Sequence, residues 1–199
     1  MRHVTVSLLN INEAPLTINV LEKLAQLSTQ DWAVQLILVD NGSEVEHLRP
    51  LLDWFVAHKD RFVEFLFVTA SRNLGCEGGR NIAFKLALAD RILILDNDLI
   101  LPEEATWLNR LWLRLESDPR FGIVGPMLIF ADYPDIVQGT GMGLTHRGRL
   151  GYLNRGERVA EMPPTPAEVG LRKPVCSAAL TVPFVPGLAV GFVLAFGVW

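Results

Sequence analysis

The sequence predicts an α/β fold with a mainly parallel sheet and helices on both faces. Apolar runs of strand length alternate with longer stretches of helical periodicity from the N-terminus to residue 116. A strand that returns to the same sheet after a helix runs parallel to the strand before it. Half of the 199 residues are apolar and 20% are charged, which is the balance of a folded domain with a sizeable core.

Four strands and four helices are expected in this region. The strands are expected at residues 4–9, 36–39, 62–68 and 92–95, and the helices at residues 15–27, 46–58, 80–89 and 103–116. Each strand is a short run dominated by apolar residues, which is typical of a strand buried on both faces. The first helix has Pro15 in its first turn, where proline is tolerated. Its apolar face consists of Leu16, Val20, Leu24 and Leu27.

A polar motif follows each predicted strand. The motifs are residues 10–12, the turn sequence DNGS at residues 40–43, residues 72–79 and residues 96–98. In sheets of this kind, ligands bind at the carboxyl ends of the strands. The four motifs therefore lie on one edge of the sheet and outline one site.

The sequence Asp96-Asn97-Asp98 directly follows four consecutive apolar residues. Two carboxylates one residue apart at the end of a buried strand repel each other and lose water, so the arrangement is costly outside a binding site. Paired oxygen ligands suit a hard divalent cation such as Mg²⁺ or Mn²⁺. The motif therefore favours a metal site, and a solvated acidic turn is the alternative.

A glycine-rich stretch from Gly75 to Gly79 precedes the helix that we expect to start at Arg80. Its glycines would let backbone amides and the helix N-terminus face an anion, and a purely structural loop is the alternative. The stretch does not match the G-x-G-x-x-G dinucleotide pattern and follows the third strand rather than the first. It therefore gives little support to a nicotinamide reductase.

Composition and the N-terminal sequence limit the partners and the cellular compartment that we expect. The net charge is −4 and the pI about 5.6, so no general basic surface is expected to bind nucleic acid. Cys76 and Cys176 are too far apart in the sequence for a disulfide framework or a zinc site, which favours a reducing compartment. Polar residues from Asn10 onward interrupt the first apolar run too early for a signal peptide.

Later segments say less about function. Residues 132–154 are rich in glycine and alternate weakly, as in a hairpin or an acceptor-side loop. Residues 161–170 read as a proline-rich loop. Trp107 and Trp112 lie on the last predicted helix, where core packing is the expected role.

Five fragments in this order resemble family 2 glycosyltransferases, the inverting, nucleotide-sugar-dependent enzymes with the GT-A (Rossmann-like) fold. They are VSLLNIN, ILVDNGS, RNLGCEGGRN, LILDNDLILP and GIVGPML, with a weaker echo in VCSAAL. The resemblance implies that the chain transfers a sugar from a nucleoside diphosphate to an acceptor hydroxyl. It also implies a nucleotide-sugar-binding domain over residues 1–130 and a partial acceptor-side subdomain over residues 131–199.

The resemblance assigns residues to the nucleotide-sugar site. Asn12 matches the asparagine that borders the nucleobase pocket, and Asp40 matches the aspartate that contacts the base or ribose. The junction between the glycine-rich loop and its helix lines the donor site. Its matching residues are Gly75, Gly79, Arg80 and Asn81.

The resemblance also assigns the metal. Asp98 matches the usual direct ligand of Mg²⁺ or Mn²⁺, Asp96 matches the carboxylate closer to the ribose, and Asn97 is a common middle residue of the D-x-D pair. The chemistry is consistent with this, because a nucleoside diphosphate leaves readily only when its charge is neutralised.

The acceptor hydroxyl normally needs a carboxylate base, which in the family comes from a later acidic segment. The 26 residues after Lys173 contain no acid and no histidine, so no catalytic base can be named. Five loop carboxylates are the substitutes available: Asp132, Asp135, Glu157, Glu161 and Glu168. We expect a chain of this sequence to bind a nucleotide sugar but to transfer it poorly.

The apolar tail, residues 183–199, has three interpretations. Residues 180–199 are long enough to span a bilayer, although Pro183 and Pro186 fit poorly there. A buried strand is the second interpretation. The third, which we favour, is that truncation or a frame shift replaces the natural sequence from about Val182, where the family resemblance stops and the composition changes abruptly.

Two other classes of protein compete with a transferase. A haloacid-type phosphatase also carries D-x-D, but its nucleophilic aspartate usually follows the first strand. A catalytically incomplete nucleotide-sugar-binding protein is the second.

For a transferase, the acceptor is a glycan, a lipid or a protein, and the sequence does not choose among them. We expect a cytoplasmic protein, with peripheral attachment to the inner face of the membrane as the alternative.

Overall fold

The structure, a computed structural model, describes residues 1–27, 32–104, 106–144, 149–163 and 191–194. These residues fall into two compact units. The first unit contains residues 1–124 and the strand Gly191–Leu194, and the second unit begins at Gly125. The assignment of a donor domain and an acceptor-side subdomain to these units stays a prediction.

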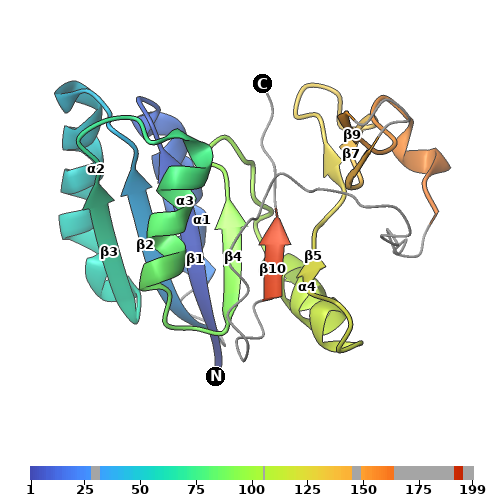
Figure 1. The fold of residues 1–199 in the computed structure, drawn as a ribbon, viewed down its shortest axis with the longest axis horizontal. Helices are drawn as coiled ribbons and strands as arrows, with labels where there is room; N and C mark the ends of the chain where they lie inside the picture. The colour runs from blue at the N-terminus through green and yellow to red at the C-terminus, as the bar shows by residue number, and fades with distance from the viewer. Residues whose placement is uncertain (28–31, 105, 145–148, 164–190, 195–199) are drawn as a thin grey trace. The chain divides into compact units, whose positions relative to one another are not determined.

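The first unit is built on one six-stranded parallel sheet of order β3-β2-β1-β4-β10-β5 (Figure 1). Its strands are β1 (Arg2–Asn10), β2 (Trp32–Asp40), β3 (Glu64–Thr69), β4 (Arg91–Leu95), β5 (Ile123–Val124) and β10 (Gly191–Leu194). The chain adds β2 and β3 on one side of β1 and then β4 on the other. The strand order therefore reverses between β1 and β4, and such switch points open a crevice at the carboxyl ends of the strands.

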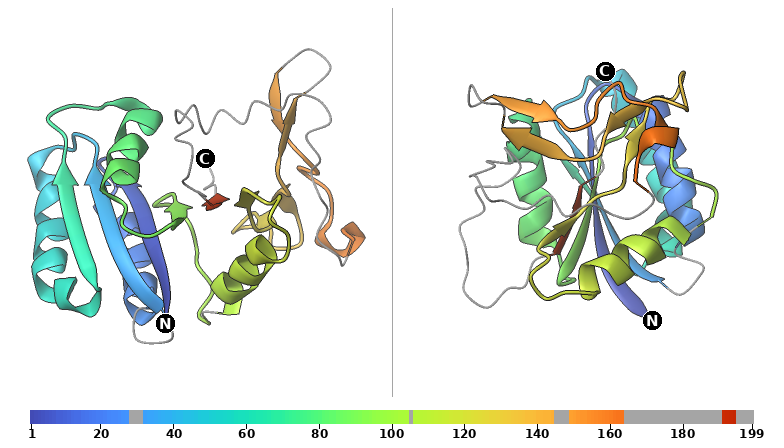
Figure 2. Two further views of the ribbon diagram at one scale, coloured as in Figure 1. Left: turned by 60° about the horizontal axis from the view of Figure 1, so that its bottom comes forward. Right: turned by 90° about the vertical axis from the view of Figure 1, so that its right-hand side faces the viewer.

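Helices cover both faces of this sheet, as predicted (Figures 1 and 2). They are α1 (Ala14–Leu27), α2 (Val45–His58), α3 (Gly75–Leu86) and α4 (Thr106–Glu116), with a short 3₁₀ turn η1 (Lys59–Arg61) after α2. The apolar sides of α1, α2 and α4 pack against one face of the sheet. Among the described helices, only α3 packs against the other face. The α/β fold with a mainly parallel sheet is confirmed.

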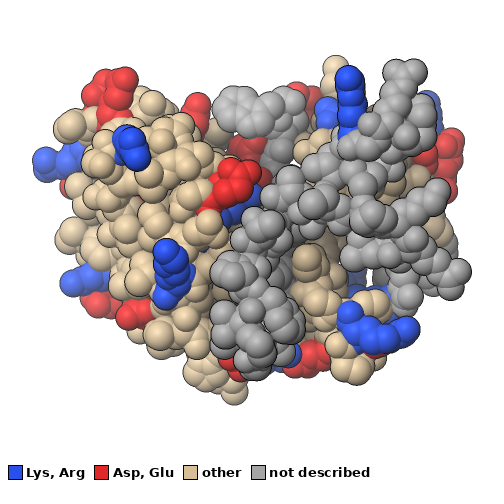
Figure 3. Space-filling model, in the orientation of Figure 1, with Lys and Arg blue, Asp and Glu red and all other residues tan. Residues whose placement is uncertain are grey.

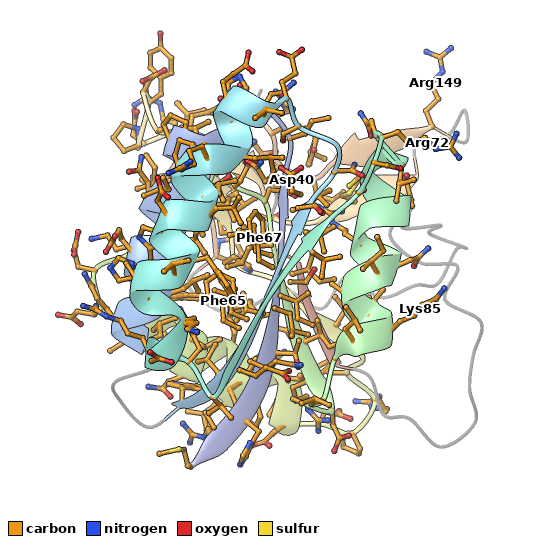
Figure 4. All side chains as sticks on the ribbon, turned by 90° about the vertical axis from the view of Figure 1, so that its left-hand side faces the viewer. Asp40, Phe65, Phe67, Arg72, Lys85 and Arg149 are labelled. Carbon is orange, nitrogen blue, oxygen red and sulfur yellow. The ribbon has the colours of Figure 1, made fainter. Side chains whose placement is uncertain are left out.

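The core follows the alternation of β2, which is buried along its whole length. Leu36 and Leu38 face the α1 and α2 layer, while Ile37 and Val39 face α3. Fully burying one such side chain stabilises the fold by roughly 1.5–3 kcal/mol. Figure 4 shows Phe65 and Phe67 of β3 between the sheet and α2.

The tryptophans of α4 pack as expected. Trp112 meets Trp32 edge to face, with ring centroids 5.2 Å apart. Trp107 is partly buried against the same core. Both rings therefore contribute to packing of the first unit.

Several predicted boundaries were wrong. β2 begins at Trp32 rather than at residue 36, because Gln35 interrupts the apolar run yet is 4% exposed and fully hydrogen-bonded. α4 begins at Thr106 rather than at residue 103. On α1, Leu16 is 41% exposed and Thr17 is completely buried in its place.

The predicted start of α3 at Arg80 was also wrong, because the helix begins at Gly75. Asparagine side chains cap its first turn. The Leu74 amide donates to Asn41 Oδ1 at 3.0 Å and the Gly75 amide donates to Asn73 Oδ1 at 2.8 Å. Helix starts need such partners for amides that have none within the helix, so the glycine-rich stretch forms the first turns of the helix rather than a loop before it.

The described residues of the second unit contain two antiparallel strand pairs. β6 (Leu128–Ile129) pairs with β7 (Val137–Gly139), β8 (Met142–Leu144) pairs with β9 (Leu150–Tyr152), and a 3₁₀ turn η2 (Val159–Glu161) follows. Residues 132–154, expected as a hairpin or a loop, thus contain the β8–β9 pair. Arg155 lies over the rings of Phe130 and Tyr152, at 5.4 and 5.3 Å from their centroids, and such contacts stabilise by about 0.5–1 kcal/mol at exposed sites.

Parts of the predicted later segments lie outside the described residues. They include Glu168, residues 164–170 of the proline-rich segment and most of the apolar tail. The described part of the tail is β10, which pairs in parallel with β4 and with β5. No helix in the described ranges has the length and apolar character that crossing a membrane requires.

Candidate functional site

The predicted site residues of the first unit gather at the carboxyl ends of β1, β2 and β4. Asn10 ends β1 and pairs in register with Asp40, the last residue of β2. On the other side of β1, Leu8 pairs with Leu95, the residue before Asp96. The polar ends of three strands therefore meet beside the switch point between β1 and β4.

A buried hydrogen-bonded network joins these strand ends to helix α1. We call it the Asn10 network; its members are Asn10, Thr17, Asp40, Ser43 and Asn97. The Asn10 amide nitrogen donates to Asp40 Oδ2 at 2.7 Å and to Ser43 Oγ at 3.2 Å. The Thr17 hydroxyl donates to Asn10 Oδ1 at 2.6 Å. Asn10 thus connects the end of β2 with α1.

Asp40 is completely buried. Its Oδ1 accepts the Ser43 amide at 2.9 Å, and its Oδ2 accepts the Ser43 hydroxyl at 2.5 Å in addition to the Asn10 amide. Both carboxylate oxygens of Asp40 therefore close the DNGS turn by accepting hydrogen bonds from Ser43, three residues on. Gly42 has φ +86° within the turn, and a Cβ there would lie 2.4 Å from the backbone carbon of Arg72. The DNGS turn therefore packs directly on the turn that precedes α3, and Figure 4 shows Asp40 and Arg72 at the same end of the sheet.

Asn12 links the loop after β1 to the start of α2. Its backbone is in the left-handed region, with φ 54°, which asparagine tolerates better than most residues. The backbone amide of Asn12 donates to Ser43 Oγ at 2.8 Å. The side-chain oxygen Oδ1 of Asn12 accepts a hydrogen bond from the backbone amide of Glu44 at 2.9 Å. Asn12 is exposed and borders the DNGS turn.

The glycines of α3 have different surroundings. Gly75 has φ +76° and open space around it, with only Glu77 Oε2 near the position that a Cβ would occupy, at 3.7 Å. Gly79 is buried, and a Cβ there would lie 2.4 Å from Leu9 Cδ1 of β1. Gly75 thus lies at the exposed start of the helix, whereas Gly79 lets the helix pack closely on the sheet.

Arg80 and Asp96 form an ion pair between α3 and the turn after β4. The Arg80 side chain is 13% exposed and that of Asp96 is 26% exposed. Arg80 Nε is buried without a hydrogen-bond partner among the described residues. Asn81 is exposed, and at 100° per residue it is turned away from the side of α3 on which Gly79 packs. The structure thus brings Arg80 to the site but not Asn81.

Asp98 contributes a buried carboxylate oxygen to the turn after β4. Its Oδ1 is buried and has no hydrogen-bond partner in the described part of the chain. Burial raises the pKa of Asp98, and the neighbouring Asp96 carboxylate raises it further. A buried acceptor without a donor is costly, and a cation would remove that cost. The residues present therefore fit a divalent cation.

The protein supplies few ligands for such a cation. Within the described residues, no three His, Cys, Asp or Glu side chains are arranged to hold a metal ion. Mg²⁺ sites that serve phosphate substrates commonly use one or two carboxylates and complete their coordination with phosphate oxygens and water. Asp96 and Asp98 match that type of site, in which substrate provides the other ligands.

A second buried polar group lies earlier along the same strands. We call it the Gln35 cluster; its members are Thr5, Gln35 and Glu64. Gln35 Nε2 donates to Glu64 Oε2 at 2.6 Å and to the Leu86 carbonyl at 3.0 Å. Gln35 Oε1 accepts the Thr5 hydroxyl at 2.6 Å and the Leu88 amide at 2.9 Å. Every bonding position of the Gln35 amide is used, and the cluster ties the end of α3 to the sheet.

Sequence reasoning did not include Asn10, Thr17 or Ser43 among the site residues. Asn10 and Ser43 belong to motifs that were noticed, but their contacts depend on the register of β1 with β2. Thr17 directly follows Leu16 of the predicted apolar face of α1, and it is buried. Its place beside that face is the signal in the sequence that could have indicated it.

Figure 3 shows basic and acidic side chains interspersed over the face in view.

Comparisons with known proteins indicate the family to which the chain belongs. The model of glycosyl transferase family 2 matches residues 6–171. No curated protein matches the sequence. Among solved structures, the mannosyltransferase PcManGT from Pyrobaculum calidifontis in complex with GDP-Man and Mn²⁺ is 27% identical, with a TM-score of 0.51 over 63% of this chain and 35% of that one.

A second solved structure shows the same fold. S. aureus TarS 1-349 in complex with UDP is 18% identical, with a TM-score of 0.50 over 64% of this chain and 36% of that one. The chain therefore spans little more than a third of the length of these structures. Since the family model covers most of its residues and its sheet and helices are those of GT-A glycosyltransferases, the chain belongs to glycosyl transferase family 2.

Proposed function

We propose that this chain forms the donor-binding part of a glycosyltransferase that moves a sugar from a nucleoside-diphosphate sugar to an acceptor hydroxyl. The observation that carries the proposal is the buried Oδ1 of Asp98, which has no hydrogen-bond partner among the residues that the structure describes and lies after β4 beside the switch point. Family membership supports it, and so does the similarity to PcManGT, whose structure contains GDP-Man and Mn²⁺.

Asp98 and Asp96 would hold a Mg²⁺ or Mn²⁺ ion. When bound, the cation would neutralise the diphosphate and make it a better leaving group. Asp98 offers the free oxygen, whereas Asp96 is already paired with Arg80. We propose that Arg80 fixes the position of Asp96 and adds positive charge next to the phosphates.

The nucleoside would bind at the DNGS turn. Asp40 has no exposed surface, so it would act by holding Ser43 and, through it, the backbone amide of Asn12. Asn12 and the start of α3 at Gly75 are both exposed, so a ligand could reach them. Asn81 and Gly79 take a smaller part in this proposal, the first because it is turned away and the second because it packs on Leu9.

The transfer itself would be an inverting displacement. The acceptor hydroxyl of a glycan, a lipid or a protein would attack the sugar carbon from the side opposite the leaving diphosphate, with a carboxylate taking its proton. Of the loop carboxylates considered, Glu157 accepts the Asn154 amide nitrogen at 2.9 Å, and Asp132, Asp135 and Glu161 are exposed. We assign the base to none of them.

Isothermal titration calorimetry with UDP, GDP and dTDP, each with and without Mn²⁺, tests this proposal. We expect one nucleoside diphosphate to bind at least tenfold more tightly with Mn²⁺, because the diphosphate completes the coordination of the cation. Asp98→Ala should abolish that gain. Glu64→Ala, which removes a carboxylate from the Gln35 cluster, is the matched control and should keep it.

Two results would contradict the proposal: no nucleoside diphosphate binds, or the gain with Mn²⁺ is the same in Asp98→Ala as in the unaltered protein. Transfer of a labelled sugar to an acceptor then separates the transferase from its alternative, a protein that binds nucleotide sugars without transferring them.

A further inference from the structure

We propose that Thr17 and Asn97 are positioning residues that hold the turn after β4 in the geometry in which its two carboxylates bind a divalent cation. The inference rests on the proposed function and adds to it two residues outside the carboxylate pair. Thr17 lies in α1, and neither side chain offers a charge to a ligand.

Asn97 is anchored on one face of the sheet. Its amide nitrogen donates to Thr17 Oγ1 at 3.0 Å and lies 3.5 Å from Asn10 Oδ1. Thr17 is completely buried, and its hydroxyl in turn donates to Asn10 Oδ1 at 2.6 Å. The middle residue of the D-x-D turn is thus fixed to α1 and to the end of β1.

Asp96 is anchored on the opposite face. Its partner Arg80 belongs to α3, and α3 packs on the face of the sheet that α1 does not cover. The turn is therefore held from both sides through consecutive residues. Asp98 comes next, and its buried Oδ1 has no partner among the described residues.

This arrangement explains how an unsatisfied carboxylate oxygen stays where a cation can use it. Asp96 and Asp98 repel each other when both are charged, and a turn free to rotate would separate them or move Asp98 into water. The hydrogen bonds of Asn97 oppose that motion. Groups that orient metal ligands without touching the metal typically change metal affinity by about 10- to 100-fold when removed.

The test compares three threonine variants of the full chain. Thr17→Val removes the hydroxyl at nearly constant volume, and Thr17→Ser keeps it. Thr5→Val is the matched control, because Thr5 is also completely buried and its hydroxyl also donates to an amide side chain, that of Gln35. Thr5 lies five residues before Asn10 in β1, about 16 Å along the strand.

Three quantities are measured for each variant. Calorimetry gives the affinity, with and without Mn²⁺, of the nucleoside diphosphate that the unaltered protein binds, and thermal denaturation gives Tm. Thr17→Val should lose tenfold or more of the affinity with Mn²⁺ and less than twofold without it. Thr17→Ser should stay within twofold of the unaltered protein in both. Thr5→Val should lower Tm to a similar extent as Thr17→Val but leave both affinities unchanged.

Equal losses with and without Mn²⁺ in Thr17→Val, or no loss at all, would overturn the inference while leaving the proposed function intact. Absence of any Mn²⁺ effect in the unaltered protein would overturn both. If Thr17→Val does not fold, Asn97→Ala makes the same test from the other end of the hydrogen bond, because Asn97 is only partly buried. Unchanged Mn²⁺-dependent affinity in Asn97→Ala would also overturn the inference.

Discussion

The Gln35 cluster and the Asn10 network are two buried polar groups of one sheet, and they differ in whether an unsatisfied acceptor lies next to them. Gln35 uses both donors and both lone-pair directions of its amide on protein partners. Asn10 is similarly saturated. However, the residue after Asn97 is Asp98, and its buried Oδ1 has no partner among the described residues.

The comparison shows that buried polarity alone does not indicate a site. A closed set of hydrogen bonds, such as the Gln35 cluster, stabilises a connection between helix and sheet, and nothing remains for a ligand to satisfy. The Asn10 network contains the same chemistry but lies next to an acceptor, Asp98 Oδ1, that no described residue satisfies. That free acceptor, at the switch point of the strand order, is what points to a ligand.

The largest effect is expected where the Asn10 network depends on close backbone contact. In Gly42→Ala the new Cβ would lie 2.4 Å from the backbone carbon of Arg72, and the residue would keep φ +86°. The two penalties together should lower the free energy of unfolding by about 3–4 kcal/mol. Urea denaturation followed by circular dichroism measures it.

Gly75→Ala is the matched control for that prediction. Gly75 also has a positive φ, of +76°, but no backbone atom stands near its Cβ position. Only the conformational penalty applies, so we expect a loss of about 1–2 kcal/mol. Equal losses in the two variants would show that the contact between the turns does not contribute.

The next prediction compares the removal of one hydrogen-bonded side chain from each group, Gln35 from the Gln35 cluster and Asp40 from the Asn10 network. Gln35→Ala and Asp40→Ala each leave several buried groups unpaired and should lower the free energy of unfolding by about 2–3 kcal/mol. Only Asp40→Ala should also weaken nucleoside diphosphate binding, by about tenfold, because the DNGS turn loses its support. Calorimetry with pyrophosphate and Mn²⁺ is the control, and the affinity for pyrophosphate should stay nearly unchanged in both variants. Weaker nucleotide binding in Gln35→Ala would contradict the distinction.

Much of the fold was predictable because the strands are dense in apolar residues. The alternation of strand and helix indicated the parallel sheet, and α1 and α2 lie within one residue of their predicted bounds. The start of α3 was missed because tertiary hydrogen bonds from Asn41, together with Asn73, cap it. Glycine propensity argued for a loop there, and contacts from another strand end overrode it.

The site was predictable in part for a related reason. Strand ends of a parallel sheet meet at one edge, so Asp40 and Asp96 could be placed together from sequence alone. The support of the site could not be predicted in the same way. Thr17 reaches Asn97 across 80 positions of the sequence, and no local pattern in α1 indicates that pairing. The ion pair of Arg80 with Asp96 likewise depends on how α3 packs.

The smallest effect is expected from removing the unsatisfied charge. Because burial and the Asp96 carboxylate raise the pKa of Asp98 above its ordinary value of 3.8, its charged form destabilises the metal-free protein at neutral pH. Asp98→Asn removes that charge while keeping the shape of the side chain. We expect its Tm at pH 7 without metal to exceed that of the unaltered protein by roughly 1–2 °C. Glu64→Gln, in the saturated Gln35 cluster, should give no such gain.

The pH dependence fixes the sign of this last effect. A carboxyl whose pKa is raised on folding destabilises the protein above that raised pKa, and the cost disappears as the pH falls below 3.8, where the group is protonated in both states. The advantage of Asp98→Asn should therefore stay constant above the raised pKa and shrink between that pKa and 3.8. Thermal denaturation at several pH values, in the presence of a chelator, measures it. An advantage that grows on acidification would mean that the Asp98 carboxylate is stabilised by a partner in the folded protein, and the contrast with the Gln35 cluster would fail at the atom on which it depends.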